Sequence, residues 1–329
     1  MKWCNVGFGK RVAIWVVLSW VTMMAQAIAQ QYQFTTLDDP AGTGTQLIGI
    51  SGSEILGSYV DGSDNTQTFL YSGTFNTLNL NAPGAVGATI PTAISGGNIV
   101  GYFDTNDPSG SRLRGFLLSG TTYTVLGQGE GFYDVQPFGV SGSNVVGTYT
   151  DTSGNDHGFL YNGFMDPHID YSTQYGANVT YPVAISGSEI AGYYVDSLGY
   201  SQGFVYDAGN YTLLNDPLAV SGIYHTDTEA TGISGSNVVG FYIGSDGNKN
   251  GFLYNGGNYI TLDDPLGVRG TIITGIDGDD LVGYYIDGSG EDHGFMASPV
   301  PESATWVSLI VGGGIMLLVI RRRVAILLP

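Results

Sequence analysis

One sequence unit is repeated six times along the chain, at intervals of 43 to 48 residues. A triplet of the Ile-Ser-Gly type marks each copy, and the six triplets begin at Ile50, Ile94, Val140, Ile185, Ile233 and Ile276. A unit of this length is too small to bury its own apolar face, so neighbouring copies are expected to pack on one another. This repetition restricts the chain to solenoid and propeller architectures.

Three further columns recur in every copy. Seven residues after the triplet begins there is a glycine, at Gly57, Gly101, Gly147, Gly192, Gly240 and Gly283. Two positions later there is an aromatic residue, at Tyr59, Phe103, Tyr149, Tyr194, Tyr242 and Tyr285. A later column is all phenylalanine, at Phe69, Phe116, Phe159, Phe204, Phe252 and Phe295. Such invariant large apolar residues favour core packing over ligand stacking, and an interior glycine predicts a bulge or a close backbone approach.

Each unit contains four strand-like runs separated by turn residues. In the last unit the runs are 259–262, 271–276, 281–286 and 294–296, with Asp-Pro, Asp-Gly and Ser-Gly sequences between them. These dipeptides favour turns because glycine accepts a positive φ and aspartate side chains bond the local backbone. Six units of about 45 residues with four strands each predict an all-β fold, a β-propeller of six four-stranded blades over 30–298. An open β-solenoid is the alternative, and the lack of distinct capping copies favours a closed ring.

The repeat region is strongly acidic. Residues 30–298 hold 28 acidic and 4 basic residues, a net charge of −24. Because nucleic-acid phosphates repel such a surface, nucleic acid is excluded as a partner. The only cysteine is Cys4, which lies in the N-terminal leader described next, so no disulfide is expected in the mature domain.

Residues 1–29 have the pattern of a secretory signal peptide. Lys10 and Arg11 close a basic region, an apolar stretch covers 12–24, and Ala27 and Ala29 form an A-x-A cleavage site. A retained N-terminal membrane anchor is the alternative, but the apolar run is short for one. The prediction is export of the chain.

The C-terminal segment 299–329 has three parts in a fixed order. Val300, Pro301 and Glu302 precede an uncharged stretch at 303–320, which is long enough to predict a transmembrane helix. A basic cluster then follows, consisting of Arg321, Arg322 and Arg323, which is expected to stay on the cytoplasmic side.

This tail resembles the PEP-CTERM sorting signal of bacterial envelope proteins, although Ser303 replaces the second proline and 324–329 extend past the arginines. The resemblance implies that an exosortase-type transpeptidase recognises the tail. It also implies a location in the cell envelope or extracellular matrix, with the helix holding the chain in the inner membrane before processing. An ordinary C-terminal membrane anchor is the alternative.

The repeats themselves resemble the HAF family of extracellular repeats, whose units carry a His-Ala-Phe triplet. Here the triplet is His-Gly-Phe at 157–159 and at 293–295, and the other copies replace the histidine. The resemblance supports a secreted bacterial protein and implies no known activity. Because His157 and His293 belong to the third and sixth copies, they are not expected to form a catalytic or metal-binding pair.

Two turns are the best candidates for a metal site. Asp151 and Asn155 lie in one, and Asp287 and Glu291 lie in the other. Oxygen ligands at alternate positions suit weak extracellular calcium sites, but neither turn follows the full EF-hand spacing. Hairpin turns use the same residues without metal, so no cofactor is predicted and calcium stays an alternative.

The irregular stretch 164–181 is the best candidate for a ligand site. It combines acids, a histidine and tyrosines, namely Asp166, His168, Asp170, Tyr171 and Tyr175. Such a set suits either a sugar-binding surface or an enzyme site. The Asp-Asp-Pro sequences at 38–40 and 263–265 are interpreted as turns and not as paired catalytic carboxylates, which usually come from different elements.

The sequence contains no recognisable nucleophile elbow, zinc-binding helix or phosphate-binding loop. We therefore expect a non-catalytic structural or binding module of the bacterial surface or exopolysaccharide matrix, with a polysaccharide or a surface protein as partner. The alternatives are a secreted propeller enzyme acting on polysaccharide and a calcium-dependent adhesion module.

Overall fold

The structure is a computed structural model that describes residues 32–106, 112–128, 131–166, 169–171, 179–219 and 228–300. One compact unit covers Phe34–Ala297. A second unit comprises Met1–Gln33 and Ser298–Pro329, of which only 32–33 and 298–300 are described. The signal peptide at 1–29, the predicted helix at 303–320 and the sorting residues from Pro301 onward lie outside the described residues. In the part of the chain that is described, no helix has the length and apolarity needed to cross a membrane.

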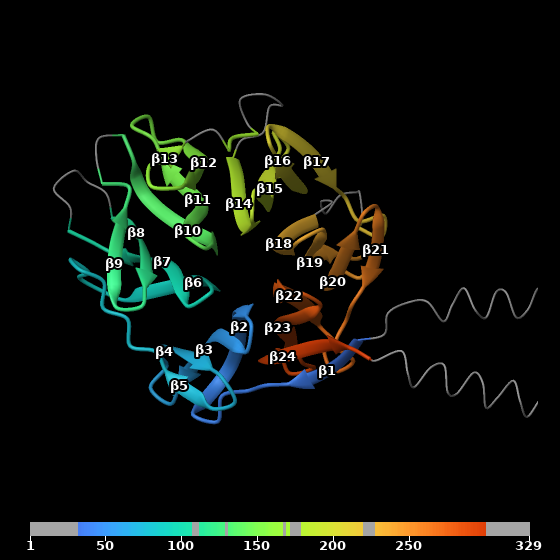
Figure 1. Ribbon diagram of the computed structural model, residues 1–329. Coiled ribbons are helices and arrows are strands. Elements are labelled where there is room, and N and C mark those ends of the chain that lie inside the picture. Colours follow the sequence, from blue (N-terminus) through green and yellow to red (C-terminus); the bar gives the residue numbers. More distant parts are fainter. Residues whose placement is uncertain are drawn as a thin grey trace, which may run out of the picture. The chain divides into compact units, whose positions relative to one another are not determined.

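The described secondary structure is all β, in four-stranded antiparallel sheets that surround a common centre (Figure 1). The first three sheets consist of β2 (Gly42–Ser51), β3 (Glu54–Asp61), β4 (Thr66–Tyr71) and β5 (Phe75–Thr77); β6 (Thr89–Ser95), β7 (Asn98–Asp104), β8 (Leu113–Ser119) and β9 (Thr122–Leu126); and β10 (Tyr133–Ser141), β11 (Asn144–Thr150), β12 (Asp156–Tyr161) and β13 (Met165–Asp166).

The other three sheets complete the ring. They consist of β14 (Val179–Ser186), β15 (Glu189–Val195), β16 (Ser201–Asp207) and β17 (Asn210–Leu214); β18 (Thr228–Ser234), β19 (Asn237–Ile243), β20 (Lys249–Asn255) and β21 (Asn258–Thr261); and β22 (Gly270–Asp277), β23 (Asp280–Ile286), β24 (Asp292–Pro299) and β1 (Tyr32–Thr36). A single parallel pair, Lys249 with Gly270, joins the last two sheets. The prediction of a six-bladed propeller is confirmed.

The assignment of strands to blades differs from the sequence unit by one strand. The first run of the last unit, 259–262, was expected to begin the sixth blade, but β21 instead pairs with β20 as the outer strand of the fifth. The turn between β20 and β21 is too short to reach another blade, whereas the Asp-Asp-Pro corner that follows carries the chain to the next inner strand. Each sequence unit therefore supplies one strand to the preceding blade.

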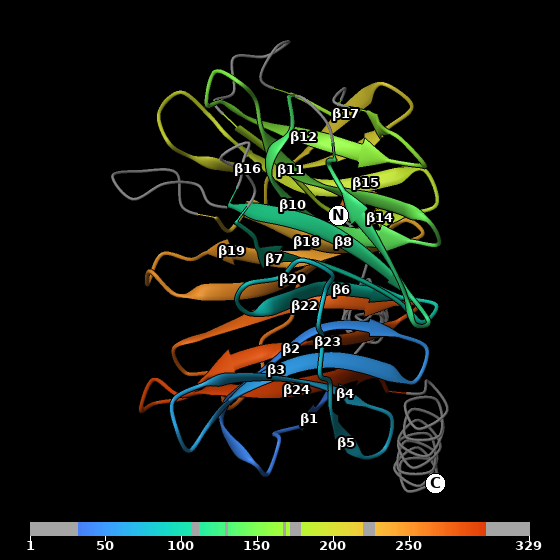
Figure 2. The same ribbon diagram turned by 90° about the vertical axis from the view of Figure 1, so that its left-hand side faces the viewer.

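This offset closes the ring through β1, which lies beside β24 in both views (Figures 1 and 2). Phe34 packs on Phe295 with ring centroids 5.2 Å apart, and the amide of Leu37 donates to the carbonyl of Gly294. In other blades the same place is taken by an aromatic residue of the blade's own outer strand, as in the contacts of Phe69 with Phe75 and of Phe252 with Tyr259. The chain thus forms a closed ring and not an open solenoid.

The glycine column lies where two backbones approach closely. Gly147 pairs with Pro137, and the pairing register then shifts, so that Gly139 faces Val146. The extra residue is a β-bulge in the inner strand. A Cβ atom on Gly147 would lie only 2.1 Å from the carbonyl oxygen of Gln136, which no side chain can accept. Both predictions for this column, a bulge and a close approach, are confirmed.

The phenylalanine column forms the core of the blades. All six phenylalanines are 0 % exposed, and the aromatic column is also buried. Gly57 pairs with Phe69, and a Cβ atom on Gly57 would overlap that ring. Phe69 belongs to an apolar cluster that also contains Leu47 of the first blade and Val282 of the sixth. The predicted role of these columns in packing between blades is confirmed.

Candidate functional site

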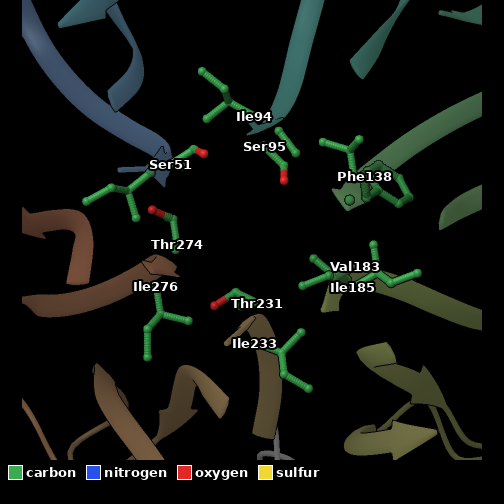
Figure 3. Close-up of a pocket in the computed structure, with 18 of the residues that line it drawn as sticks. Ser51, Ile94, Ser95, Phe138, Val183, Ile185, Thr231, Ile233, Thr274 and Ile276 are labelled. Atoms are coloured by element: carbon green, nitrogen blue, oxygen red, sulfur yellow. The ribbon is translucent and has the colours of Figure 1, made fainter. Parts of the chain in front are cut away.

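The six inner strands, β2, β6, β10, β14, β18 and β22, surround a central pocket with a volume of about 460 Å³. Figure 3 shows side chains of all six strands arranged around it, with the hydroxyl groups of Ser51 and Ser95 directed inward. The volume falls within the range of about 300–1,000 Å³ that is typical of ligand pockets. The pocket is therefore the candidate binding site of the propeller.

The second residue of each triplet forms a ring at one end of the pocket. We call this set the serine ring, and it consists of Ser51, Ser95, Ser141, Ser186, Ser234 and Asp277. The glycine amide that follows in the next blade donates to this residue: Gly96 to Ser51 at 2.8 Å and Gly278 to Ser234 at 3.0 Å. Three more junctions have the same bond, from Gly187 to Ser141, Gly235 to Ser186 and Gly52 to Asp277.

The serine ring therefore explains the Ile-Ser-Gly triplet. The isoleucine or valine is buried between blades, the hydroxyl oxygen accepts the amide of the neighbouring blade, and the glycine takes a positive φ, for example 59° at Gly52. Only glycine adopts this left-handed conformation without strain. The triplet is thus a joint between blades, and its hydroxyl groups also face the pocket.

A threonine column adds a second set of bonds between blades. The hydroxyl group of Thr274 donates to the carbonyl of Leu47 at 2.7 Å, which joins the sixth blade to the first. Thr92 and Thr231 make the corresponding bonds to Pro137 at 2.8 Å and Ile273 at 2.5 Å. Isoleucine, phenylalanine and valine take this place in the other three blades, at Ile48, Phe138 and Val183. The pocket wall thus combines apolar side chains with hydroxyl groups.

Tyrosines gather toward the other end of the inner strands. The rings of Tyr181 and Tyr193 stack with centroids 4.8 Å apart. Burial and the nearby charge of Glu229 raise the pKa of Tyr193, and the same two causes contribute at Tyr284. Tyr193, Glu229 and Tyr284 come from three successive blades. No sequence pattern marks this cluster, because its members occupy positions where the six repeats differ.

The carboxylates proposed as calcium ligands brace their own turns. Oδ1 of Asp151 accepts the amides of Ser153 at 2.7 Å and Asn155 at 2.9 Å. Oδ1 of Asp287 accepts the amides of Ser289, Gly290 and Glu291. The backbone bond from Asn155 is the main reason that the pKa of Asp151 is lowered, and the side-chain bond from Ser289 has that role at Asp287. Among the described residues, no group of three His, Cys, Asp or Glu side chains is arranged to hold a metal ion.

The Asp-Asp-Pro corners are turns, as predicted. Oδ1 of Asp39 accepts the amide of Ala41 at 2.9 Å, and Oδ1 of Asp264 accepts the amide of Leu266 at 2.8 Å. Asp263 instead bonds the amide of Gly251 in the adjacent strand. Burial raises the pKa of both Asp263 and Asp264.

Each of the two family-like histidines bridges a pair of aspartates. Nδ1 of His157 lies 2.7 Å from Asp170 and Nε2 lies 3.2 Å from Asp151. Nδ1 of His293 lies 2.8 Å from Asp38, which follows β1. Because the two aspartates beside His157 contact opposite ring nitrogens, they do not converge on a common point as metal ligands do. The histidines lie in separate blades, and each clamps its blade to the connector that leads to the next.

These contacts make the two clamps dependent on pH. Burial opposes protonation of His157, but the bonds to Asp170 and Asp151 outweigh it and raise the pKa of the ring. At His293 the bond to Asp38 is the main cause of the raised pKa. A histidine whose pKa is higher in the folded than in the unfolded chain stabilises the fold fully below about pH 6.5, and this contribution disappears as pH rises through the folded value.

We therefore expect the double variant His157→Gln/His293→Gln to fold, and to be less stable than the parent by about 1 kcal/mol per site near pH 6. The difference should shrink as the pH rises above about 6.5 and through the raised pKa values of the two histidines, because the parent loses its imidazolium bonds there. Urea unfolding at a series of pH values measures this. A difference that stays constant from pH 5 to pH 9 would assign the histidines a role in packing alone.

Three of the predicted ligand residues of 164–181, namely Asp166, Asp170 and Tyr171, are described by the structure. Tyr171 is buried and stacks on Tyr194 with centroids 4.3 Å apart, and Asp170 is held by His157. Asp166 ends β13 and is half-buried. His168 and Tyr175 lie outside the described residues. Asp170 and Tyr171 therefore contribute to the structure of the third and fourth blades, and the central pocket lies elsewhere.

No protein-family model and no curated protein matches this chain. Among solved structures, a neuraminidase-like protein of a flat-faced bat isolate from Peru is 12% identical, with a TM-score of 0.48 and coverage of 83% of this chain and 95% of that chain. A lectin of Aleuria aurantia in complex with α-methyl-L-fucoside is 11% identical, with a TM-score of 0.44 and coverage of 83% and 97%.

The β-propeller domain of the Trilobed protease from Pyrococcus furiosus is also 11% identical. Its TM-score is 0.42, and the match covers 64% of this chain and 66% of that domain. At these identities the similarity concerns the fold alone.

Proposed function

We propose that this protein is an exported, non-catalytic binding module of the bacterial cell surface or exopolysaccharide matrix, with a polysaccharide or a surface protein as its ligand. The observation that carries the proposal is the central pocket. It has the volume of a ligand site, and its walls combine aliphatic side chains with hydroxyl groups from six blades.

The use of the ionisable side chains supports binding over catalysis. General acid–base catalysis requires a titratable group within hydrogen-bond reach of the reacting atoms. Asp151, Asp287 and the two histidines instead hold turns and connectors through bonds within the protein. The described residues that line the pocket are aliphatic, aromatic or hydroxyl-bearing residues and glycines, with Asp277 as their single carboxylate.

The two ends of the sequence support the proposed location. The signal-peptide pattern at 1–29 accounts for export, and the tail from Val300 to Arg323 accounts for sorting by an exosortase-type transpeptidase. In this proposal the uncharged stretch at 303–320 holds the precursor in the inner membrane. The acidic repeat region faces outward in this arrangement.

Filling the pocket tests the binding function. We expect full-length protein purified in detergent to bind members of a glycan panel, and the variant Val183→Trp to lose that binding at least tenfold, because the indole ring occupies the pocket. Phe164→Trp is the matched control, since this side chain is 65% exposed and remote from the pocket lining. Equal binding by Val183→Trp and the parent would place the ligand elsewhere.

Changing the tail tests the proposed sorting. We expect the double variant Pro301→Ala/Glu302→Ala to accumulate as unprocessed precursor in the inner membrane, while the hydrophobic stretch and Arg321–Arg323 stay intact. Fractionation and immunoblotting of both forms measure this. A plain membrane anchor would be indifferent to the change, so identical size and location of the two forms would exclude the exosortase.

A further inference from the structure

The serine ring contains one member that differs from the others in charge. Five blades have serine and the sixth has Asp277, which is the only ionisable residue among those that line the pocket. Oδ2 of Asp277 accepts the amide of Gly52 at 2.6 Å, the same bond that the serines make to the blades that follow them. The joint between blades therefore does not require a carboxylate, because serine makes the same bond in four other blades.

The joint between blades does not account for the negative charge and the second carboxylate oxygen of Asp277, so both are available to a ligand. Within the part of the chain that the structure describes, Gly52 is the one hydrogen-bond donor that contacts this carboxylate. Asp277 is exposed on the pocket side of its hairpin. A carboxylate with an available oxygen at the end of an otherwise uncharged pocket favours a ligand that carries a positive charge and donates hydrogen bonds.

The hairpins that follow the inner strands strengthen this preference. They cover 51–54, 95–98, 141–144, 186–189, 234–237 and 277–280, and none of them contains a lysine or arginine. Glu54, Glu189, Asp279 and Asp280 lie on these hairpins in addition to Asp277. The resulting negative potential attracts cations and repels anionic sugars such as uronic acids.

The rest of the wall suits a hydroxylated ligand. The oxygens of Ser51, Ser141, Ser186 and Ser234 each accept a backbone amide, and a hydroxyl group that accepts one bond still has its own hydrogen to donate. The half-buried side chains of Ile48, Phe138 and Val183, which also line the pocket, offer apolar surface to the C–H face of a sugar ring.

From this arrangement we propose that the pocket binds an amino sugar of a surface polysaccharide, with its primary ammonium group paired to Asp277 and its hydroxyl groups bonded to the serine ring. The inference rests on the proposed binding function and specifies its ligand class. Neutral and acidic glycans lack the cation that Asp277 selects. The charge pair also predicts binding that weakens as salt increases.

The experiment compares two oligosaccharides with the same sugar backbone, one with free ammonium groups and one in which each of them is a neutral acetamido group. Full-length protein in detergent is titrated by calorimetry at pH 6 with a glucosamine tetrasaccharide and with its fully N-acetylated counterpart, at 20 mM and 300 mM salt. We expect the amino form to bind at least tenfold more tightly at low salt, and the difference to narrow at high salt. A lysine tetrapeptide serves as a cation without sugar hydroxyls and should bind more weakly than the amino form.

Two matched variants locate the effect. Asp277→Ser restores the residue of the other five blades, so the bond from Gly52 and the unfolding midpoint should be retained while the preference for the amino sugar is lost. Asp279→Ser removes the same charge from the same hairpin, two residues outside the pocket lining, and should change affinity less than threefold. Equal losses in the two variants would indicate a diffuse charge effect and overturn the role of Asp277.

The remaining outcomes separate this inference from the proposed function. Equal binding of the two tetrasaccharides, abolished by Val183→Trp, would overturn the ammonium preference and leave the binding function in place. Equal or tighter binding of the lysine peptide would assign the pocket to a basic protein partner instead. Failure of every glycan to bind would overturn the amino-sugar proposal and exclude a polysaccharide as the ligand of the proposed binding function, which leaves a surface protein as its ligand.

Discussion

Removal of one whole blade is expected to cost far more stability than its share of the residues. Deletion of 52–95 joins Ser51 directly to Gly96 and keeps the phase of the repeats, so the product has five blades with intact strands. In the intact ring each blade is covered on both sides, for example by the bond from Thr274 to Leu47 between the sixth blade and the first. Five blades of this curvature leave a gap and expose two faces, which removes about a third of the interfaces instead of a sixth.

Denaturant unfolding of the parent and of the five-blade protein measures this effect. The denaturant concentration at the unfolding midpoint should be much lower for the five-blade protein. Loss of cooperative unfolding in that protein would also agree with loss of the closed ring. In an open array, stability is approximately a sum of unit and nearest-neighbour terms, so a lost terminal unit removes one interface only. A decrease in the unfolding free energy of one sixth would therefore contradict the ring.

Truncation of a phenylalanine from the invariant column is expected to have the largest effect of any single substitution. Phe69 is 0 % exposed, packs edge-on against Phe75 at 5.1 Å and covers Gly57, where there is no side chain to fill the space. Its apolar cluster includes Val282 of the sixth blade, so the cavity in Phe69→Ala would open at the closing interface. Substitutions of this kind cost about 3–5 kcal/mol because the surroundings collapse only partly.

Phe164→Ala is the matched control. Phe164 is 65% exposed, and removal of an exposed side chain usually changes stability by less than about 0.5 kcal/mol. Thermal and urea unfolding of the two variants should therefore differ by several kcal/mol. If both variants are equally stable, the phenylalanine column is not a core, and stacking of a ligand on these rings would have to be reconsidered.

Local sequence patterns were sufficient for much of the architecture. The positions of Gly147 and Phe159 within their unit predicted a close backbone approach and a buried ring, and both are present. The Asp-Asp-Pro corners and the Asp151 turn were interpreted correctly as turns, because an aspartate side chain bonds amides only two to four residues away. The turns and the close backbone approach depend on interactions within one unit, whereas the burial of Phe159 also involves residues of the preceding blade. All of them recur at the same positions in the repeated unit, which made them recognisable.

The assignment of strands to blades and the contacts that close the ring depend on long-range interactions, which the repeat pattern does not reveal. The sequence unit does not reveal that its first run belongs to the preceding blade, because a strand pattern carries no information about its partner. The clamp between His293 and Asp38 joins residues that are 255 positions apart, and the bond from Gly52 to Asp277 joins residues 225 apart. Both contacts exist only because the ring closes.

The candidate site was also predictable only in part from the sequence. The Ile-Ser-Gly triplets were visible as a marker, and their six serine-column positions could be counted. The radial arrangement of the inner strands brings these positions together around one pocket. It also places Asp277 there as a single carboxylate among hydroxyl groups. The sequence by itself determined the blade as a unit, since strands and turns are set by neighbours along the chain. Only the closed ring decided which blades touch and which side chains share the axis, because those contacts require all six blades to be in place.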